Sequence, residues 1–121
     1  MNKYKGTEKD IHRRIYRFVL DCFRDVVQKI FRKPENIPII EQLASSLTSI
    51  GANDREADAA GSRKDFIAKY TIVRKETNET LFWLSLVHDL ILVNQKTVSQ
   101  YLVEGEEILN IVSSIIKNAR G

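Results

Sequence analysis

Four long segments of this chain place apolar residues three and four positions apart, and this pattern most constrains its fold. The segments span about residues 7–32, 36–60, 62–92 and 97–118. Such spacing lines one face of an α-helix, so each segment predicts an amphipathic helix. Five Gly and two Pro are too few turn residues for an all-β sandwich. Because the connections are short, we expect an all-α, antiparallel up-down-up-down four-helix bundle, a single domain over residues 1–121.

Several residues predict where these helices begin and end. The first helix should end near Pro34, because the residue before a proline avoids the α conformation. Pro38 fits the first turn of the second helix. Gly61 suits the left-handed position after a helix, and Ser62 suits the N-cap of the third helix. Gly51, inside the second helix, indicates either a close approach of two helices or a bend or break.

The second half of the third helix is apolar on nearly every face. A helix that is apolar all round is buried all round, whereas each helix of a four-helix monomer keeps one face in water. We therefore expect either a central position or a contact with another subunit, and we favour a subunit interface at Phe82, Trp83 and Leu86. Trp83 could instead stack on nucleic-acid bases. The core stripe of the same helix should be Phe66, Tyr70, Val73, Thr77, Thr80, Leu84 and Val87.

Composition and apolar runs exclude several classes of protein. Cys22 is the only cysteine, so one chain has neither a disulfide framework nor a thiolate zinc site. Cys22 lies on the apolar stripe of the first helix, which predicts a buried, reduced thiol. The longest apolar run, residues 81–93, is too short to span a membrane and contains His88 and Asp89. No signal peptide is visible, and we expect a soluble, cytoplasmic protein with no membrane partner.

Charge is unevenly distributed along the chain. The net charge is +3, but residues 1–34 carry a balance of +6 and residues 35–61 a balance of −4. One interpretation is that the first two helices are neighbours with complementary solvated faces. The other is that the first helix contacts the phosphates of RNA or DNA, since Arg13, Arg17 and Arg24 lie close to one line, which an oligomer would repeat around its assembly. The candidate phosphate contacts are Lys9, Arg13, Arg14, Arg17, Arg24, Arg32 and Lys33.

Three glutamates are the carboxylates most expected at a seam between helices: Glu56, Glu76 and Glu79. A bundle can hold a di-metal site built from Glu and Glu-x-x-His pairs, but this chain has no Glu-x-x-His. It also has no nucleophile elbow, glycine-rich phosphate loop or Cys–His signature. We therefore expect ion pairs, such as Lys75 with Glu79, and a non-enzymatic protein with no catalytic residue, metal or cofactor.

A spaced motif runs through the second and third helices. Its members are Ser49, Ile50, Gly51, Ala52, Asn53, Glu56, Ala57, Ala60, Ser62, Asp65, Phe66, Ile67, Lys69, Lys75, Glu76, Glu79, Thr80, Trp83 and Leu84. In this motif the chain resembles the bacterial four-helix-bundle proteins first named for open reading frames in intervening sequences of 23S rRNA genes. The resemblance covers about residues 10–118 and is most specific over 42–84.

The resemblance implies an up-down bundle that assembles as a homopentamer and has a largely undefined function. Family members are suspected of binding RNA or DNA. A related branch serves as the accessory protein of reverse transcriptases in diversity-generating retroelements. This chain has Ser45 where family members often carry Arg, which weakens the case for nucleic-acid binding. We expect an oligomeric bundle that binds RNA or DNA through its first helix; the alternative is an adaptor for a protein partner, such as that accessory subunit.

Overall fold

The computed structural model describes residues 8–121, with side chains from Ile11 onward. Four α-helices make up most of the chain, and the described residues contain no strand, so the prediction of an all-α fold is confirmed. Two short 3₁₀ helices connect the first α-helix to the second. The elements are α1 (Glu8–Asp25), η1 (Val27–Lys29), η2 (Pro34–Asn36), α2 (Ile37–Asp58), α3 (Arg63–Asp89) and α4 (Gln95–Arg120).

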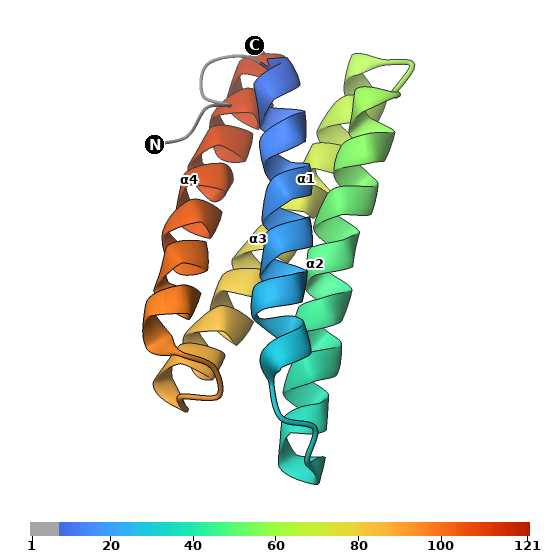
Figure 1. Cartoon of the computed structure of the whole chain (residues 1–121). Coiled ribbons are helices and arrows are strands. Elements are labelled where there is room, and N and C mark those ends of the chain that lie inside the picture. The colour runs from blue at the N-terminus through green and yellow to red at the C-terminus, as the bar shows by residue number, and fades with distance from the viewer. Residues whose placement is uncertain (1–7) are drawn as a thin grey trace.

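The four α-helices form a bundle in which each helix packs against two others. α1 contacts α2 and α4, α3 contacts the same two helices, and α1 and α3 lie diagonally across the bundle. In Figure 1 the colour runs down α1, up α2, down α3 and up α4. The seam between α1 and α2 and the seam between α3 and α4 therefore lie on opposite sides of the molecule.

The core is built from the apolar stripes that the periodicity predicts. In α3 the predicted stripe is buried from Tyr70 to Val87. Its two threonines satisfy their hydroxyl groups by donating to backbone carbonyls one turn earlier, Thr77 to Val73 at 2.6 Å and Thr80 to Glu76 at 2.8 Å. Cys22 is fully buried, and burial raises the pKa of its thiol, which keeps it protonated and unreactive.

The first helix ends earlier than predicted. α1 stops at Asp25 rather than near Pro34, and the chain continues through η1 into an extended Ile30. Two successive β-branched residues, Val26 and Val27, follow the helix and lower its propensity to continue. The tighter 3₁₀ turn buries both valines together with Ile30, so the connection is anchored in the core.

The second helix runs unbroken through its internal glycine. Pro38 lies in the first turn of α2, as predicted, and the helix continues through Gly51 to Asp58. A break at Gly51 is therefore excluded. A Cβ atom added there would lie 3.6 Å from Val19 Cγ2, which is an ordinary contact, so packing does not require glycine at this position.

The two remaining connections use different caps. Ser62 caps α3 by accepting a hydrogen bond from the backbone N–H of Asp65 at 3.1 Å, as predicted. Gly61 does not adopt the left-handed conformation, so that prediction is wrong. After α3 it is Ile91 that takes a positive φ of 56°, and Asn94 then caps α4, which begins slightly earlier than predicted.

Candidate nucleic-acid interface

Of the arginines predicted to bind phosphates, four lie on α1, and three of these are exposed. Arg13, Arg17 and Arg24 all lie within one unbroken helix, so their alignment along its surface is preserved. Arg32 and Lys33 are exposed in the connection that follows, and the side chain of Lys9 lies outside the described residues. The structure therefore leaves a basic row on α1 open to solvent.

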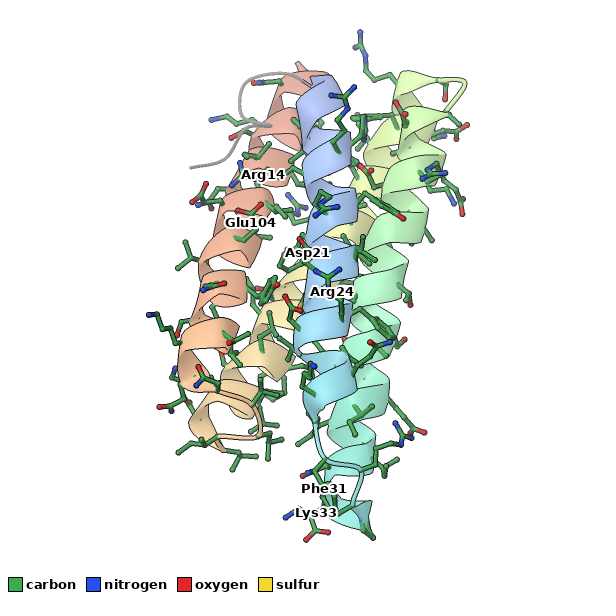
Figure 2. All side chains as sticks on the ribbon, in the orientation of Figure 1. Arg14, Asp21, Arg24, Phe31, Lys33 and Glu104 are labelled. Atoms are coloured by element: carbon green, nitrogen blue, oxygen red, sulfur yellow. The ribbon has the colours of Figure 1, made fainter. Side chains whose placement is uncertain are left out.

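Arg14 lies elsewhere, in the seam between α1 and α4. Its side chain lies beside Glu104 of α4 (Figure 2) and is 2% exposed. It donates to both carboxylate oxygens of Glu104, at 2.7 and 2.8 Å, and to Glu107 at 2.5 Å. The hydrogen bond to Glu104 is the main cause that raises the pKa of Arg14 above its ordinary value. Contrary to our expectation, Arg14 has no exposed surface for a phosphate. Its position three residues after Ile11 and four before Phe18 places it on the buried stripe.

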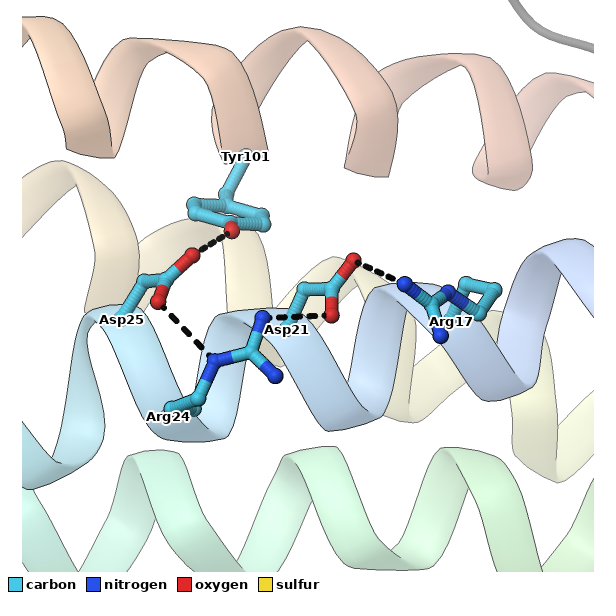
Figure 3. Close-up of polar contacts among 5 residues, drawn as sticks. All are labelled: Arg17, Asp21, Arg24, Asp25 and Tyr101. Atoms are coloured by element: carbon cyan, nitrogen blue, oxygen red, sulfur yellow. Dashed lines mark hydrogen bonds and ion pairs between the residues drawn. The ribbon is translucent and has the colours of Figure 1, made fainter.

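Acidic residues of α1 occupy part of the basic row. Asp21 lies between Arg17 and Arg24, at 3.6 and 2.9 Å, and Arg24 also reaches Asp25 at 3.3 Å (Figure 3). Among the described residues, no arginine of α1 pairs with an acidic residue of α2. The contacts that fit the complementary-face interpretation are those of His12 with Asp54 and Asp58 of α2, at 2.8 and 3.2 Å. Exposed ion pairs contribute about 0–1 kcal/mol, so a phosphate can displace Asp21 at small cost.

A pocket of about 330 Å³ opens between α1 and α2, beside the N-terminal half of the basic row. Arg13 and Arg17 line it from α1, and Arg55 lines it from α2. The side chains of Arg13 and Arg55 form no hydrogen bond or ion pair with any described residue. Tyr16, which is 56% exposed, lies among these arginines and also lines the pocket. We call this site the α1–α2 pocket.

A hydrogen-bonded cluster lies beneath the arginines of the α1–α2 pocket. Asp54 is buried, accepts a hydrogen bond from the Tyr70 hydroxyl at 2.7 Å, and lies 2.8 Å from His12 Nδ1. The other ring nitrogen of His12 lies 3.2 Å from Asp58. Asp54 thus fixes the orientation of His12 toward the pocket wall. The carboxylate of Asp54 is engaged by Tyr70 and His12 rather than exposed to a ligand.

Four members of this site were not predicted from the sequence: His12, Tyr16, Asp54 and Arg55. The sequence contained a signal for two of these residues. Tyr16 is an aromatic residue off the apolar stripe, between two arginines. Asp54 is a carboxylate on the buried stripe of α2, four residues after Ile50. Which helix supplies the partners of such a carboxylate depends on packing, which the sequence does not show.

The motif residues of α2 make local contacts. Asn53 donates to the backbone carbonyl of Ser49 at 2.9 Å and to its hydroxyl oxygen at 3.1 Å. Glu56 pairs with Lys69 of α3 at 2.7 Å. These motif residues stabilise α2 and its seam with α3, and only Gly51 of the motif in α2 lines the α1–α2 pocket.

The motif glutamates of α3 are half-buried near one another. Burial, followed by the charge of Glu79, raises the pKa of Glu76, and Lys75 opposes this shift. The expected ion pair between Lys75 and Glu79 is not among those formed by the described residues. Within residues 11–121, no three His, Cys, Asp or Glu side chains are placed to hold a metal ion together.

The predicted interface residues lie near the C-terminal end of α3. Phe82 is 59% exposed, whereas Trp83 and Leu86 are half-buried. The rings of Phe82 and Trp83 pack edge to face with their centroids 4.8 Å apart. Leu90 and Ile91 follow and are also exposed. Within residues 8–121, no helix combines the length and apolarity needed to cross a membrane.

Comparison with known proteins agrees with the fold and the motif. A family model described as 23S rRNA-intervening sequence protein matches residues 7–114. A crystal structure of a protein of unknown function from the S23 ribosomal protein family of Bacteroides thetaiotaomicron is 32% identical, with a TM-score of 0.80, over 88% of this chain and 98% of that one. No protein of curated function matches the chain. The resemblance noted in the second and third helices is thus confirmed, and the chain belongs to the 23S rRNA-intervening sequence protein family.

Proposed function

We propose that this protein is a non-enzymatic helical bundle that binds single-stranded RNA or DNA at the α1–α2 pocket. The observation that carries the proposal is the exposed Tyr16 between Arg13 and Arg17, with Arg55 lining the same pocket from the other helix. Proteins that bind single strands combine a basic groove with aromatic side chains on which bases stack. A duplex hides its base faces, so this arrangement favours a single strand.

The balance of charge at the α1–α2 pocket supports the proposal. Arg13, Arg17 and Arg55 supply three guanidinium groups, which bind phosphates through two parallel hydrogen bonds. Of the two carboxylates that line the pocket, Asp54 is buried and bonded to Tyr70 and His12. The other, Asp58, is exposed and lies 3.2 Å from His12 Nε2. The exposed rim therefore carries three guanidinium groups against one carboxylate and is mainly cationic.

We further propose that the protein acts as a homo-oligomer, with five subunits expected from the family resemblance. The exposed Phe82 beside the half-buried Trp83 and Leu86 supports an interface on α3. An oligomer repeats the α1–α2 pocket in each subunit, so one strand can contact several pockets and bind more tightly than any single pocket allows.

Fluorescence anisotropy with single-stranded RNA, single-stranded DNA and a matched duplex tests the binding. The double variant Arg13→Glu/Arg17→Glu should abolish single-strand binding, because phosphate contacts become repulsive. The matched control, Lys64→Glu/Lys96→Glu, makes the same change in net charge at exposed positions in the first turns of α3 and α4. Glutamate is favourable at a helix N-terminus, so the control should fold normally.

Salt dependence adds a second readout. Between about 50 and 200 mM salt the wild type should lose affinity steeply, and neutralising both arginines should reduce the log–log slope by about 2. Binding that survives the charge reversal, or that falls equally in the control, would reject the α1–α2 pocket. Such a result would favour the adaptor alternative, and a search for a protein partner would follow.

A further inference from the structure

A second groove runs along the seam between α3 and α4, on the opposite side of the bundle from the α1–α2 pocket. It consists of two adjoining cavities of about 380 and 440 Å³, which share Arg74 and Ser113 in their linings. Lys75, Lys117 and Arg120 add three further cations, and no acidic side chain lines either cavity. We call this site the α3–α4 groove.

The cation at the centre of the α3–α4 groove has no protein counter-charge. Arg74 is half-buried, yet its side chain forms no hydrogen bond or ion pair with any described residue. Arg14 offers a direct comparison, because it lies in the α1–α4 seam and is held by Glu104 and Glu107. Arg14 is withdrawn from water, and carboxylates compensate for its charge. The guanidinium of Arg74 keeps contact with solvent and has no carboxylate partner among the described residues, so it is open to an incoming anion.

Helix stability explains only part of this cluster. Lys117 and Arg120 lie in the last turn of α4, where cations interact favourably with the helix dipole. Arg74 lies near the middle of α3, where the dipole offers no such stabilisation. Neighbouring like charges also repel one another. An anion bound in the groove would offset this repulsion.

We propose that the α3–α4 groove is a second phosphate-binding site, which takes phosphate groups from a nucleic-acid strand or from free phosphate. The guanidinium of Arg74 suits bidentate binding of phosphate, and the hydroxyl group of Ser113 can donate an additional hydrogen bond. From Asn110 to Arg120 the groove follows about 15 Å of helix, which is room for more than one phosphate of a strand. The site shares no residue with the α1–α2 pocket, so it does not depend on the proposed function.

The test is a titration of ¹⁵N-labelled protein with inorganic phosphate, and separately with a short single-stranded oligonucleotide, at constant ionic strength set with chloride. Backbone amide signals of Asn110 and Ser113 should shift in a saturable manner. The double variant Arg74→Gln/Lys117→Gln should lose these shifts. The control Arg63→Gln/Lys64→Gln removes two positive charges elsewhere on α3 and should retain them.

Each outcome decides the proposal. Shifts that saturate in the wild type and control but not in the groove variant support it, and at least about tenfold tighter binding of the oligonucleotide would identify a strand as the source of the phosphates. Absence of shifts, or equal loss in the control, overturns it. Repeating the titration in Arg13→Glu/Arg17→Glu separates the two sites, because the groove signals should persist there even if the α1–α2 pocket fails.

Discussion

Arg13 and Arg14 are neighbours in the chain, yet only Arg14 is buried and bonded to carboxylates. Arg14→Ala should lower the free energy of unfolding by about 2–3 kcal/mol, because it removes the hydrogen bonds to the partly exposed Glu104 and Glu107 and leaves a cavity. Arg13→Ala should change it by less than about 0.5 kcal/mol. Urea denaturation of both variants measures the difference. Equal effects would contradict the structural role assigned to Arg14.

Asp25 makes the stability of the α1–α4 seam depend on pH. The hydrogen bond that Tyr101 donates to Asp25, at 2.5 Å, is the main cause that lowers the pKa of Asp25 below its ordinary value. A carboxyl group with a lowered pKa in the folded state stabilises the fold above its ordinary pKa, near 4, and this contribution is lost as pH falls through the lowered value.

Tyr101→Phe should therefore lower the melting temperature at about pH 7 more than at about pH 2. As the pH falls, Asp25 becomes protonated in both proteins, so the lost hydrogen bond to a charged carboxylate contributes less to the difference between them. Thermal unfolding followed by circular dichroism at several pH values measures this. A constant difference between wild type and variant across the range would show that Asp25 is not responsible.

At the scale of the helix, two internal glycines have different surroundings. In α2, a Cβ at Gly51 would make only an ordinary contact with Val19, at 3.6 Å. In α4, a Cβ at Gly105 would lie 2.8 Å from Leu81 Cδ2 and 3.5 Å from Phe18. Glycine inside a helix costs about 0.5–1 kcal/mol relative to alanine.

Gly51→Ala should therefore raise the free energy of unfolding by about 0.5–1 kcal/mol. Gly105→Ala should raise it by less, because the side chain of Leu81 must move to make room for the new Cβ. Since Gly51 lines the α1–α2 pocket, its alanine variant should also bind single-stranded nucleic acid more weakly. Denaturation and anisotropy on the same samples measure both effects. If the Gly51→Ala variant is more stable but binds with unchanged affinity, Gly51 does not contribute to binding at the α1–α2 pocket.

The helices themselves were predictable to different degrees. Apolar spacing, Pro38 and Ser62 located α2 and α3 closely, because these signals are local. The end of α1 was misplaced, because no glycine or proline marks it and burial of Val27 decides it. The row of exposed arginines could be predicted because it depends only on spacing along one helix. The α3–α4 groove could not be predicted in this way. Its cations come from two helices, and their missing counter-charges are visible only in three dimensions.

At the scale of the whole molecule, assembly and binding can be separated experimentally. Phe82 is more than half exposed, so Phe82→Glu should leave the subunit folded while placing a charge on the proposed interface. We expect light scattering to show a shift from an oligomer toward the 14.0 kDa chain. Tyr16→Glu, a matched change at an exposed aromatic residue of α1, should keep the oligomer.

The two variants should then differ in how they lose affinity for a single strand. Tyr16→Glu removes a stacking contact and adds repulsion in every pocket, so it should weaken binding of short and long oligonucleotides alike. Phe82→Glu leaves each pocket intact and removes only their linkage. It should weaken binding of long strands that reach several pockets by about 100-fold or more, with little effect on short ones. Equal losses for both lengths in Phe82→Glu would mean that the α3 patch does not hold the pockets together.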